Sequence, residues 1–240
     1  MSSDGRRHIL AIGGLRSPLS QREPLPALIA HPLDLSGAAA PRVCVLNTAN
    51  GDDPVSYQKF YAILSQHGAR VSHLQLFPMP NVDDPEDLLL SQDVIFVGGG
   101  SVANMLAVWR VHGLDHIMRR AWEAGVVLAG VSAGAICWFE GGTTDSFGPV
   151  LRPFNAGLDF LSGSYCPHYD SEPARRPTYR SLVADGTLGA GIACEDGSAA
   201  HFTDSEFTGI VAARDGVTGY LVEPDGSGGS TERRLQPVVI

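Results

Sequence analysis

Short apolar runs alternate with amphipathic stretches through the first half of the chain. Continuous apolar runs at 8–14, 42–47, 93–97 and 126–129, with an alternating run at 69–77, predict five strands. Stretches with helical periodicity lie between them, at 56–66, 84–90, 101–111 and 114–124. This β-α-β-α order predicts an α/β fold with a doubly wound, mostly parallel sheet.

The second half of the chain has a different pattern. Residues 141–163 are rich in glycine, proline and polar residues, and we expect them to be mostly loop. Short apolar runs at 192–202, 210–213 and 220–222 are separated by Asp-Gly pairs, which are typical of hairpin turns. We therefore expect antiparallel C-terminal strands at the edge of the same sheet, within a single domain that spans residues 1–240.

The sequence Gly130-Val-Ser-Ala-Gly134 stands between a predicted buried strand and a predicted buried helix. Strand, sharp turn and helix, with a serine at the turn, are the layout of a nucleophile elbow. The flanking glycines fit a turn that leaves no room for a Cβ atom. This pattern predicts that Ser132 is a nucleophile, and that the N–H of Ala133 helps to stabilise an oxyanion.

A glycine triplet, Gly98 to Gly100, also ends a predicted parallel strand, so we expect it at the same edge of the sheet as Ser132. Its backbone can supply a second N–H to an oxyanion. The spacing Gly98-x-Gly100-x-x-Ala103 also fits a dinucleotide-binding loop. We favour the oxyanion role, because no acidic residue closes a strand about 20 residues later, as that loop requires.

His168 is the histidine best placed to act as the base, because it follows Pro167 at the end of a predicted strand. The carboxylate that should orient it stays open on spacing alone, and the candidates are Glu140, Asp145, Asp170 and Glu172. Cys166, two residues before His168, leaves a Cys/His pair as a minor alternative.

Two adjacent arginines, Arg175 and Arg176, follow His168 closely. A guanidinium binds a carboxylate through two parallel hydrogen bonds, so this pair is a candidate clamp for an anionic substrate. A pair of solvated surface arginines is the alternative.

The composition indicates which partners, cofactors and cellular location to expect. The chain has 17 basic and 26 acidic residues, and its net charge of −9 argues against nucleic acid as a partner. The four cysteines have no metal-ligand spacing and are expected to be reduced, so we expect neither a metal nor another cofactor. No apolar run has the length of a membrane span, and we expect a cytoplasmic protein that does not contact membranes.

Three motifs occur in one order: V-G-G-G-S at 97–101, G-V-S-A-G-A at 130–135, and P-H-Y-D at 167–170. Together they resemble peptidase family S51, the family of aspartyl dipeptidases and cyanophycinases. The resemblance covers nearly the whole chain. It implies a flavodoxin-like, three-layer α/β/α fold related to class I glutamine amidotransferases, with serine in place of their nucleophilic cysteine.

The resemblance also implies roles for individual residues. Ser132 would be the nucleophile and His168 the base, with Gly99, Gly100 and the Ala133 N–H as the oxyanion hole. Asp145 would be the acid, with Glu140 in reserve. Arg175 or Arg176 would bind the side chain of a substrate aspartate.

The function that the resemblance implies is hydrolysis of short peptides, above all dipeptides with N-terminal aspartate, through an acyl-enzyme. A related isopeptidase or amidase with another side-chain preference is the alternative, as is a non-catalytic ligand-binding member of the fold. The expected partner is a small peptide substrate. The oligomeric state stays open, with a homodimer as one candidate.

Overall fold

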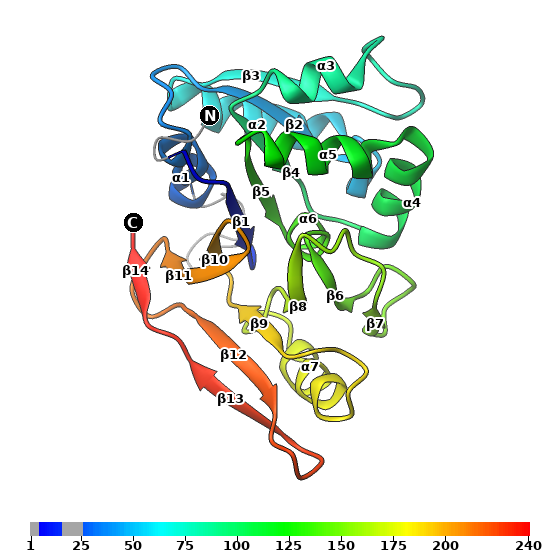
Figure 1. Cartoon of the computed structure of the whole chain (residues 1–240), viewed down its shortest axis with the longest axis vertical. Coiled ribbons are helices and arrows are strands. Elements are labelled where there is room, and N and C mark those ends of the chain that lie inside the picture. The colour runs from blue at the N-terminus through cyan, green and yellow to red at the C-terminus, as the bar shows by residue number, and fades with distance from the viewer. Residues whose placement is uncertain (1–4, 16–25) are drawn as a thin grey trace.

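A computed structural model describes residues 5–15 and 26–240 of the chain (Figure 1). An eight-stranded sheet runs in the order β14-β11-β10-β1-β5-β4-β2-β3. Five consecutive strands, β1, β5, β4, β2 and the edge strand β3, are parallel to one another. The strands of this sheet are β1 (His8–Ile12), β2 (Arg42–Leu46), β3 (Arg70–Leu74), β4 (Val94–Val97), β5 (Val127–Val131), β10 (Ser198–Thr203), β11 (Glu206–Ala212) and β14 (Pro237–Val239).

Helices cover both faces of this sheet, which explains why its central strands are apolar throughout. Along β1, Leu10 and Ile12 belong to a core cluster with residues of α1 (Pro26–Ser36) and α2 (Pro54–Gln66). The alternate residues Ile9 and Ala11 belong to another cluster, with residues of α3 (Pro85–Leu90), α4 (Val102–His112) and α5 (Leu114–Glu123). The predicted mostly parallel α/β fold is therefore confirmed.

A second sheet of six strands runs in the order β13-β12-β9-β8-β6-β7. Its strands are β6 (Phe139–Thr144), β7 (Arg152–Phe154), β8 (Leu161–Cys166), β9 (Gly191–Cys194), β12 (Gly219–Pro224) and β13 (Ser230–Arg234). The helix α7 (Arg175–Ala184) packs against β12 and β13, and the β12–β13 hairpin forms the lower end of the molecule in Figure 1. Only β6, β8 and β9 are parallel neighbours here.

Two predictions for the second half of the chain were wrong. The C-terminal strands do not all extend one sheet, because β12 joins β9 in the second sheet while β10 and β11 join β1. Residues 139–144 form the strand β6 rather than a loop. Its glycines suggested a loop, but Gly142 lets β6 approach β8 closely: a Cβ at Gly142 would lie 2.2 Å from the carbonyl oxygen of Tyr165.

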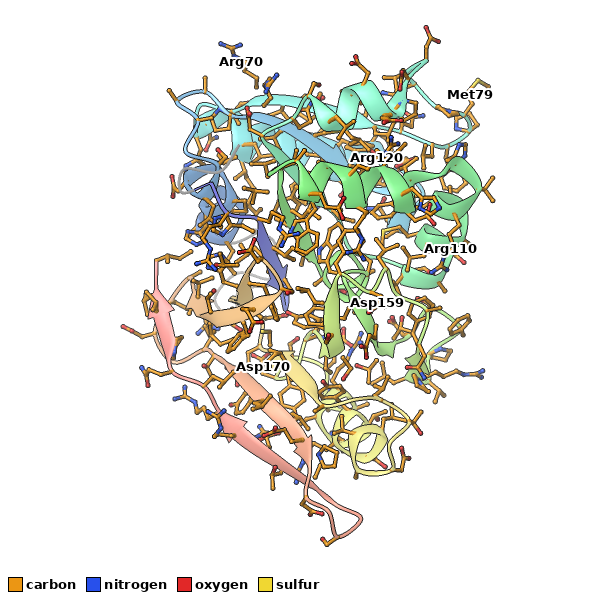
Figure 2. All side chains as sticks on the ribbon, in the orientation of Figure 1. Arg70, Met79, Arg110, Arg120, Asp159 and Asp170 are labelled. Carbon is orange, nitrogen blue, oxygen red and sulfur yellow. The ribbon has the colours of Figure 1, made fainter. Side chains whose placement is uncertain are left out.

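The surface and the core divide as expected for a globular protein. Arg70 projects from the upper edge of the molecule in Figure 2, and Arg110 and Asp159 are exposed as well. Within the described residues, no helix is both long enough and apolar enough to cross a membrane.

Candidate active site

Ser132 stands between the parallel strand β5 and the short helix α6 (Ala133–Ile136). Its backbone has φ 56° and ψ −114°, a conformation that costs energy for any residue other than glycine. The flanking glycines are sterically required, since a Cβ at Gly130 would lie 2.0 Å from the Gly134 oxygen, and one at Gly134 would lie 2.4 Å from the Val97 oxygen. The strand–turn–helix context that the motif needs is therefore present.

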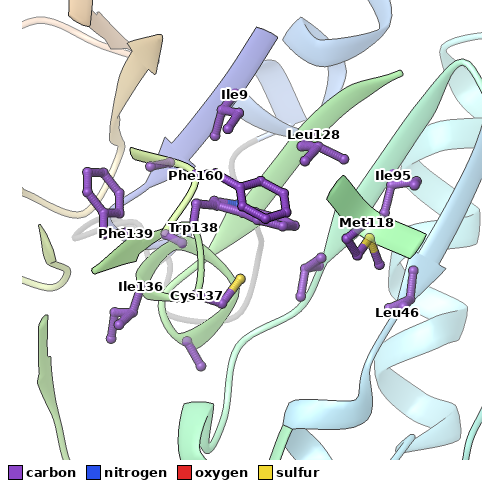
Figure 3. Packing of buried hydrophobic residues seen from close by; sticks show 14 of the residues in the cluster. Ile9, Leu46, Ile95, Met118, Leu128, Ile136, Cys137, Trp138, Phe139 and Phe160 are labelled. Carbon is purple, nitrogen blue, oxygen red and sulfur yellow. The ribbon is translucent and has the colours of Figure 1, made fainter. Parts of the chain in front are cut away.

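The residues after the elbow anchor it in the core. The chain from Ile136 to Phe139 turns inward among buried side chains that include Phe160 and Ile9 (Figure 3). Trp138 is fully buried and its ring lies 5.8 Å from that of Phe160. The strained turn at Ser132 is thus held in place by packing on its C-terminal side.

The end of β1 brings Ser132 and His168 to the same edge of the sheet. The N–H of Ser132 donates to the carbonyl oxygen of Ile12 at 3.1 Å, and the N–H of His168 donates to that of Gly13 at 3.2 Å. Both residues are partly exposed, which leaves them accessible to a ligand. His168 also has a positive φ of 54°.

The carboxylate that contacts His168 is Asp196, at 2.7 Å between Oδ1 and Nδ1. The side chain of Asp196 is 3% exposed, and its main-chain N–H donates to Asp170 Oδ1 at 2.8 Å. Gly14 makes the contact sterically feasible, because a Cβ there would lie 1.7 Å from Asp196 Oδ1 and 2.7 Å from His168 Nδ1. A buried carboxylate on Nδ1 holds the imidazole so that Nε2 can accept a proton.

Asp196 is not among the carboxylates predicted from the sequence, because the Asp196-Gly197 pair is typical of a hairpin turn. The pair instead connects β9 of the second sheet to β10 of the first. Gly197 donates its N–H to the Gly14 oxygen at 2.9 Å, so this connection lies directly against the end of β1. The signal that could have found Asp196 was therefore the Gly13-Gly14 pair, which makes room for it.

The structure does not bring Asp145 or Glu140 to His168, which corrects the expectation for the acid. Asp145 follows β6, has a 56% exposed side chain, and lies 3.8 Å from a guanidinium nitrogen of Arg175. Glu140 is an exposed residue of β6.

The glycine triplet follows β4, next to the elbow. The position that a Gly99 Cβ would occupy is 3.2 Å from the Cβ of Ser132 and 3.8 Å from its Oγ, and Gly99 is partly exposed. Gly100 packs elsewhere, since a Cβ there would lie 2.2 Å from the Ala49 oxygen. Ala133 is 1% exposed and directly follows Ser132. Of the predicted oxyanion residues, Gly99 and Ala133 therefore adjoin Ser132 most closely.

Both arginines after His168 already contact carboxylates of this chain. Arg175 is 2% exposed, and its guanidinium donates to Glu172 at 2.7 Å and to the Thr143 carbonyl oxygen at 2.8 Å. The N–H of Glu172 in turn donates to the His168 oxygen at 3.2 Å, so Arg175 connects the histidine loop to β6.

Arg176 lies on the other side of α7. It contacts Glu232 of β13 at 3.1 Å, and its guanidinium lies over the rings of Tyr169 and Tyr220. Arg176 therefore connects α7 to the β12–β13 hairpin. Of the two arginines, Arg175 is the one that is linked to His168, through its hydrogen bond to Glu172.

The remaining chemical alternatives lack support in this geometry. Burial raises the pKa of the Cys166 thiol to about 12, so a thiolate there is disfavoured at neutral pH. A dinucleotide phosphate would need free N–H groups at the start of α4, but the Ala103 N–H donates to Ser146 Oγ at 3.4 Å. No group of three or more metal-ligating side chains occurs within residues 5–15 and 26–240.

The doubly wound sheet and the strained serine beside a His–Asp pair place this chain among α/β proteins built around a nucleophile elbow. The model of peptidase family S51 matches residues 9–210, so the chain belongs to that family and is a peptidase by class. The resemblance drawn from the three motifs is confirmed.

Two relatives agree with this assignment. The chain is 43% identical over 216 residues to the uncharacterized peptidase YgaJ of Bacillus subtilis, covering 90% of this chain and 92% of that one. It is 31% identical over 123 residues to peptidase E of Shewanella denitrificans, about half of each chain.

Two crystal structures share the fold. A peptidase from an acI-B1 Actinobacterium matches with a TM-score of 0.66 at 14% identity, covering 97% of this chain and 95% of that one. A putative peptidase E from Listeria monocytogenes matches with a TM-score of 0.56 at 16% identity, covering 85% of this chain and 97% of that one.

Proposed function

We propose that this chain is a serine peptidase that hydrolyses short peptides through Ser132, His168 and Asp196. The observation that carries the proposal is the 2.7 Å contact between His168 and buried Asp196, at the edge of the sheet where the strained Ser132 lies. A buried His–carboxylate pair next to a serine in a nucleophile elbow is the arrangement that acyl transfer needs. A ligand-binding protein without turnover would have no need to retain this strained turn.

Each step follows from the roles of these residues. Nε2 of His168, the nitrogen opposite the Asp196 contact, takes the proton of Ser132 Oγ as the oxygen attacks the scissile carbonyl. His168 then gives that proton to the leaving amine, and an acyl-enzyme remains. Water, activated by the same histidine, releases the acid and restores the serine. The N–H groups of Gly99 and Ala133 stabilise the negative oxygen of both tetrahedral intermediates.

The substrate class that we propose is dipeptides with N-terminal aspartate, with Arg175 as the residue that binds the aspartate side chain. Arg175 is linked to His168 through Glu172, and its contact with Asp145 is long, at 3.8 Å. A substrate carboxylate would replace Asp145 at this guanidinium. A related amidase or isopeptidase with another preference is the second candidate, because Arg175 is buried and already paired with Glu172.

A substrate panel with matched variants tests the proposal. The unaltered protein should cleave Asp-Leu faster than Leu-Leu, and Ser132→Ala should abolish both activities. Ser162→Ala, an exposed serine on β8, is the control and should leave both rates unchanged. Full activity in Ser132→Ala would refute the mechanism, whereas equal rates on the two dipeptides would refute only the aspartate preference.

A cytoplasmic location and a homodimer stay predictions.

A further inference from the structure

Asn47 carries a buried amide group that the fold leaves without partners. The residue directly follows β2 and is 0% exposed. Among residues 5–15 and 26–240, neither its Nδ2 nor its Oδ1 has a hydrogen-bond partner. Burying an amide without hydrogen bonds destabilises a protein, and nearly all buried polar groups avoid it. This amide therefore needs an explanation that packing alone does not give.

The amide lies against the glycine triplet. Strand β2 pairs with β4 so that Leu46 is opposite Val97, which places Asn47 beside Gly98. The Gly98 N–H donates to the Leu46 oxygen at 2.8 Å. A Cβ at Gly98 would lie 2.2 Å from Asn47 Oδ1 and 3.3 Å from its Cγ, so the amide fills the space that a side chain at 98 would take.

The main chain of Asn47 is fixed, which holds the side chain in this position. Its N–H donates to the Tyr57 hydroxyl at 3.3 Å, and its carbonyl oxygen accepts from the N–H groups of Asn50 and Asp52 at 3.0 and 3.1 Å. Only the side-chain amide is left unsatisfied. Direct contact with a substrate is ruled out for this buried side chain, because Gly98 and Gly99 stand between it and Ser132.

We infer that Asn47 is a positioning residue for the glycine loop of the oxyanion hole. Its amide hydrogen-bonds the main chain at Gly98–Gly99 when the developing oxyanion draws the Gly99 N–H toward itself. A hydrogen bond that forms only in that state lowers the barrier to the reaction without tightening substrate binding. The inference rests on the proposed function, since it assigns Asn47 a role in the same site.

The test replaces Asn47 by leucine, which has the same branched shape, with methyl groups in place of the amide oxygen and nitrogen, and no hydrogen-bonding group. On the best dipeptide of the panel, Asn47→Leu should lower kcat about ten-fold, the effect of one hydrogen bond, and leave KM within about two-fold. The Tm should stay the same or rise, because the unsatisfied amide is gone. Asn47→Ala removes the amide without adding bulk near Gly98, and it should also lower kcat while leaving KM nearly unchanged. This variant tests the inference if the leucine variant does not fold.

Thr48→Val is the matched control, one residue further along. Thr48 is also buried, but its hydroxyl already accepts a hydrogen bond from the Trp109 indole N–H at 3.1 Å. Its loss should lower the Tm by about 2–4 °C and leave kcat unchanged, the opposite signature.

One result would overturn the inference: unchanged kcat in both Asn47→Leu and Asn47→Ala. If the Tm of both variants also fell, Asn47 would be a residue that stabilises the fold. Absence of peptidase activity in the unaltered protein would instead refute the proposed function, and the inference with it.

Discussion

Replacing Asp196 by asparagine tests the triad most directly. The contact between Asp196 Oδ1 and His168 Nδ1 is 2.7 Å, and the side chain is 3% exposed, so asparagine fits the same space. Its amide can donate to Nδ1, which favours the imidazole tautomer with its proton on Nε2, and this tautomer cannot accept the serine proton. In other Ser-His-Asp enzymes this change lowers kcat about 10⁴-fold, which corresponds to about 5.4 kcal/mol in the activation barrier.

The fold should tolerate the substitution, because Oδ2 of Asp196 has no hydrogen-bond partner in the described part of the chain and the bond to Asp170 uses the main-chain N–H. Initial rates at saturating dipeptide, with the Tm measured in parallel, should therefore show lost turnover at an unchanged or higher Tm.

Asp145→Asn is the control for this experiment, since it was the acid expected from the sequence. Its side chain is 56% exposed and lies 3.8 Å from Arg175, so kcat should change by no more than about two-fold at saturating substrate. The reverse result, a large loss in Asp145→Asn with activity retained in Asp196→Asn, would show that the observed pairing is not the one used in turnover.

Three further predictions follow from particular contacts. Gly14→Ala places a Cβ 1.7 Å from the triad carboxylate and should lower kcat about 10²-fold, whereas Gly189→Ala, with no atom nearer than 3.6 Å, should retain it; equal rates would contradict the steric argument. Arg175→Lys keeps the positive charge but loses the planar guanidinium that can bind a carboxylate through two hydrogen bonds, so it should raise KM for Asp-Leu more than for Leu-Leu. Equal effects on the two dipeptides would mean that the arginine only positions the histidine loop. The hydrogen bond from Arg7 holds the pKa of Asp204 below its usual value, so this carboxylate stabilises the fold above about pH 4 and less as pH falls further. Asp204→Asn should therefore lower the Tm at pH 7 but have little effect near pH 2, and a pH-independent difference would contradict this.

Local patterns predicted the parts of the fold that local physics determines. Strands such as β4 and β5 are buried on both faces, so their apolar runs are continuous and easily recognised. The sharp turn at Ser132 could be predicted because its close packing requires glycines at fixed positions on either side. The position of His168 was predicted from Pro167 and from the resemblance. In the structure, its N–H donates to the carbonyl oxygen of Gly13, directly after β1.

The carboxylate that contacts His168 could not be predicted because its position depends on how two sheets meet. Asp196 lies where the chain leaves the second sheet and enters the first, and an Asp-Gly pair looks the same there as in a hairpin. Spacing from the histidine left the carboxylate open, and the resemblance favoured Asp145 with Glu140 in reserve, but the carboxylate that contacts His168 is that of Asp196. No local pattern shows which sheet a short strand will join.

Glycine positions hold the information that the spacing of carboxylates lacks. A Cβ at Gly14, Gly98, Gly130 or Gly134 would come within 2.4 Å of another atom, and all four residues lie at the edge of the sheet where Ser132 stands. At each of them the absent side chain leaves room for a specific neighbour, which at Gly14 is the Asp196 carboxylate and at Gly98 is the Asn47 amide. Glycines that end parallel strands therefore indicate where another segment approaches the site, and for Asp196 this was the signal that the sequence contained.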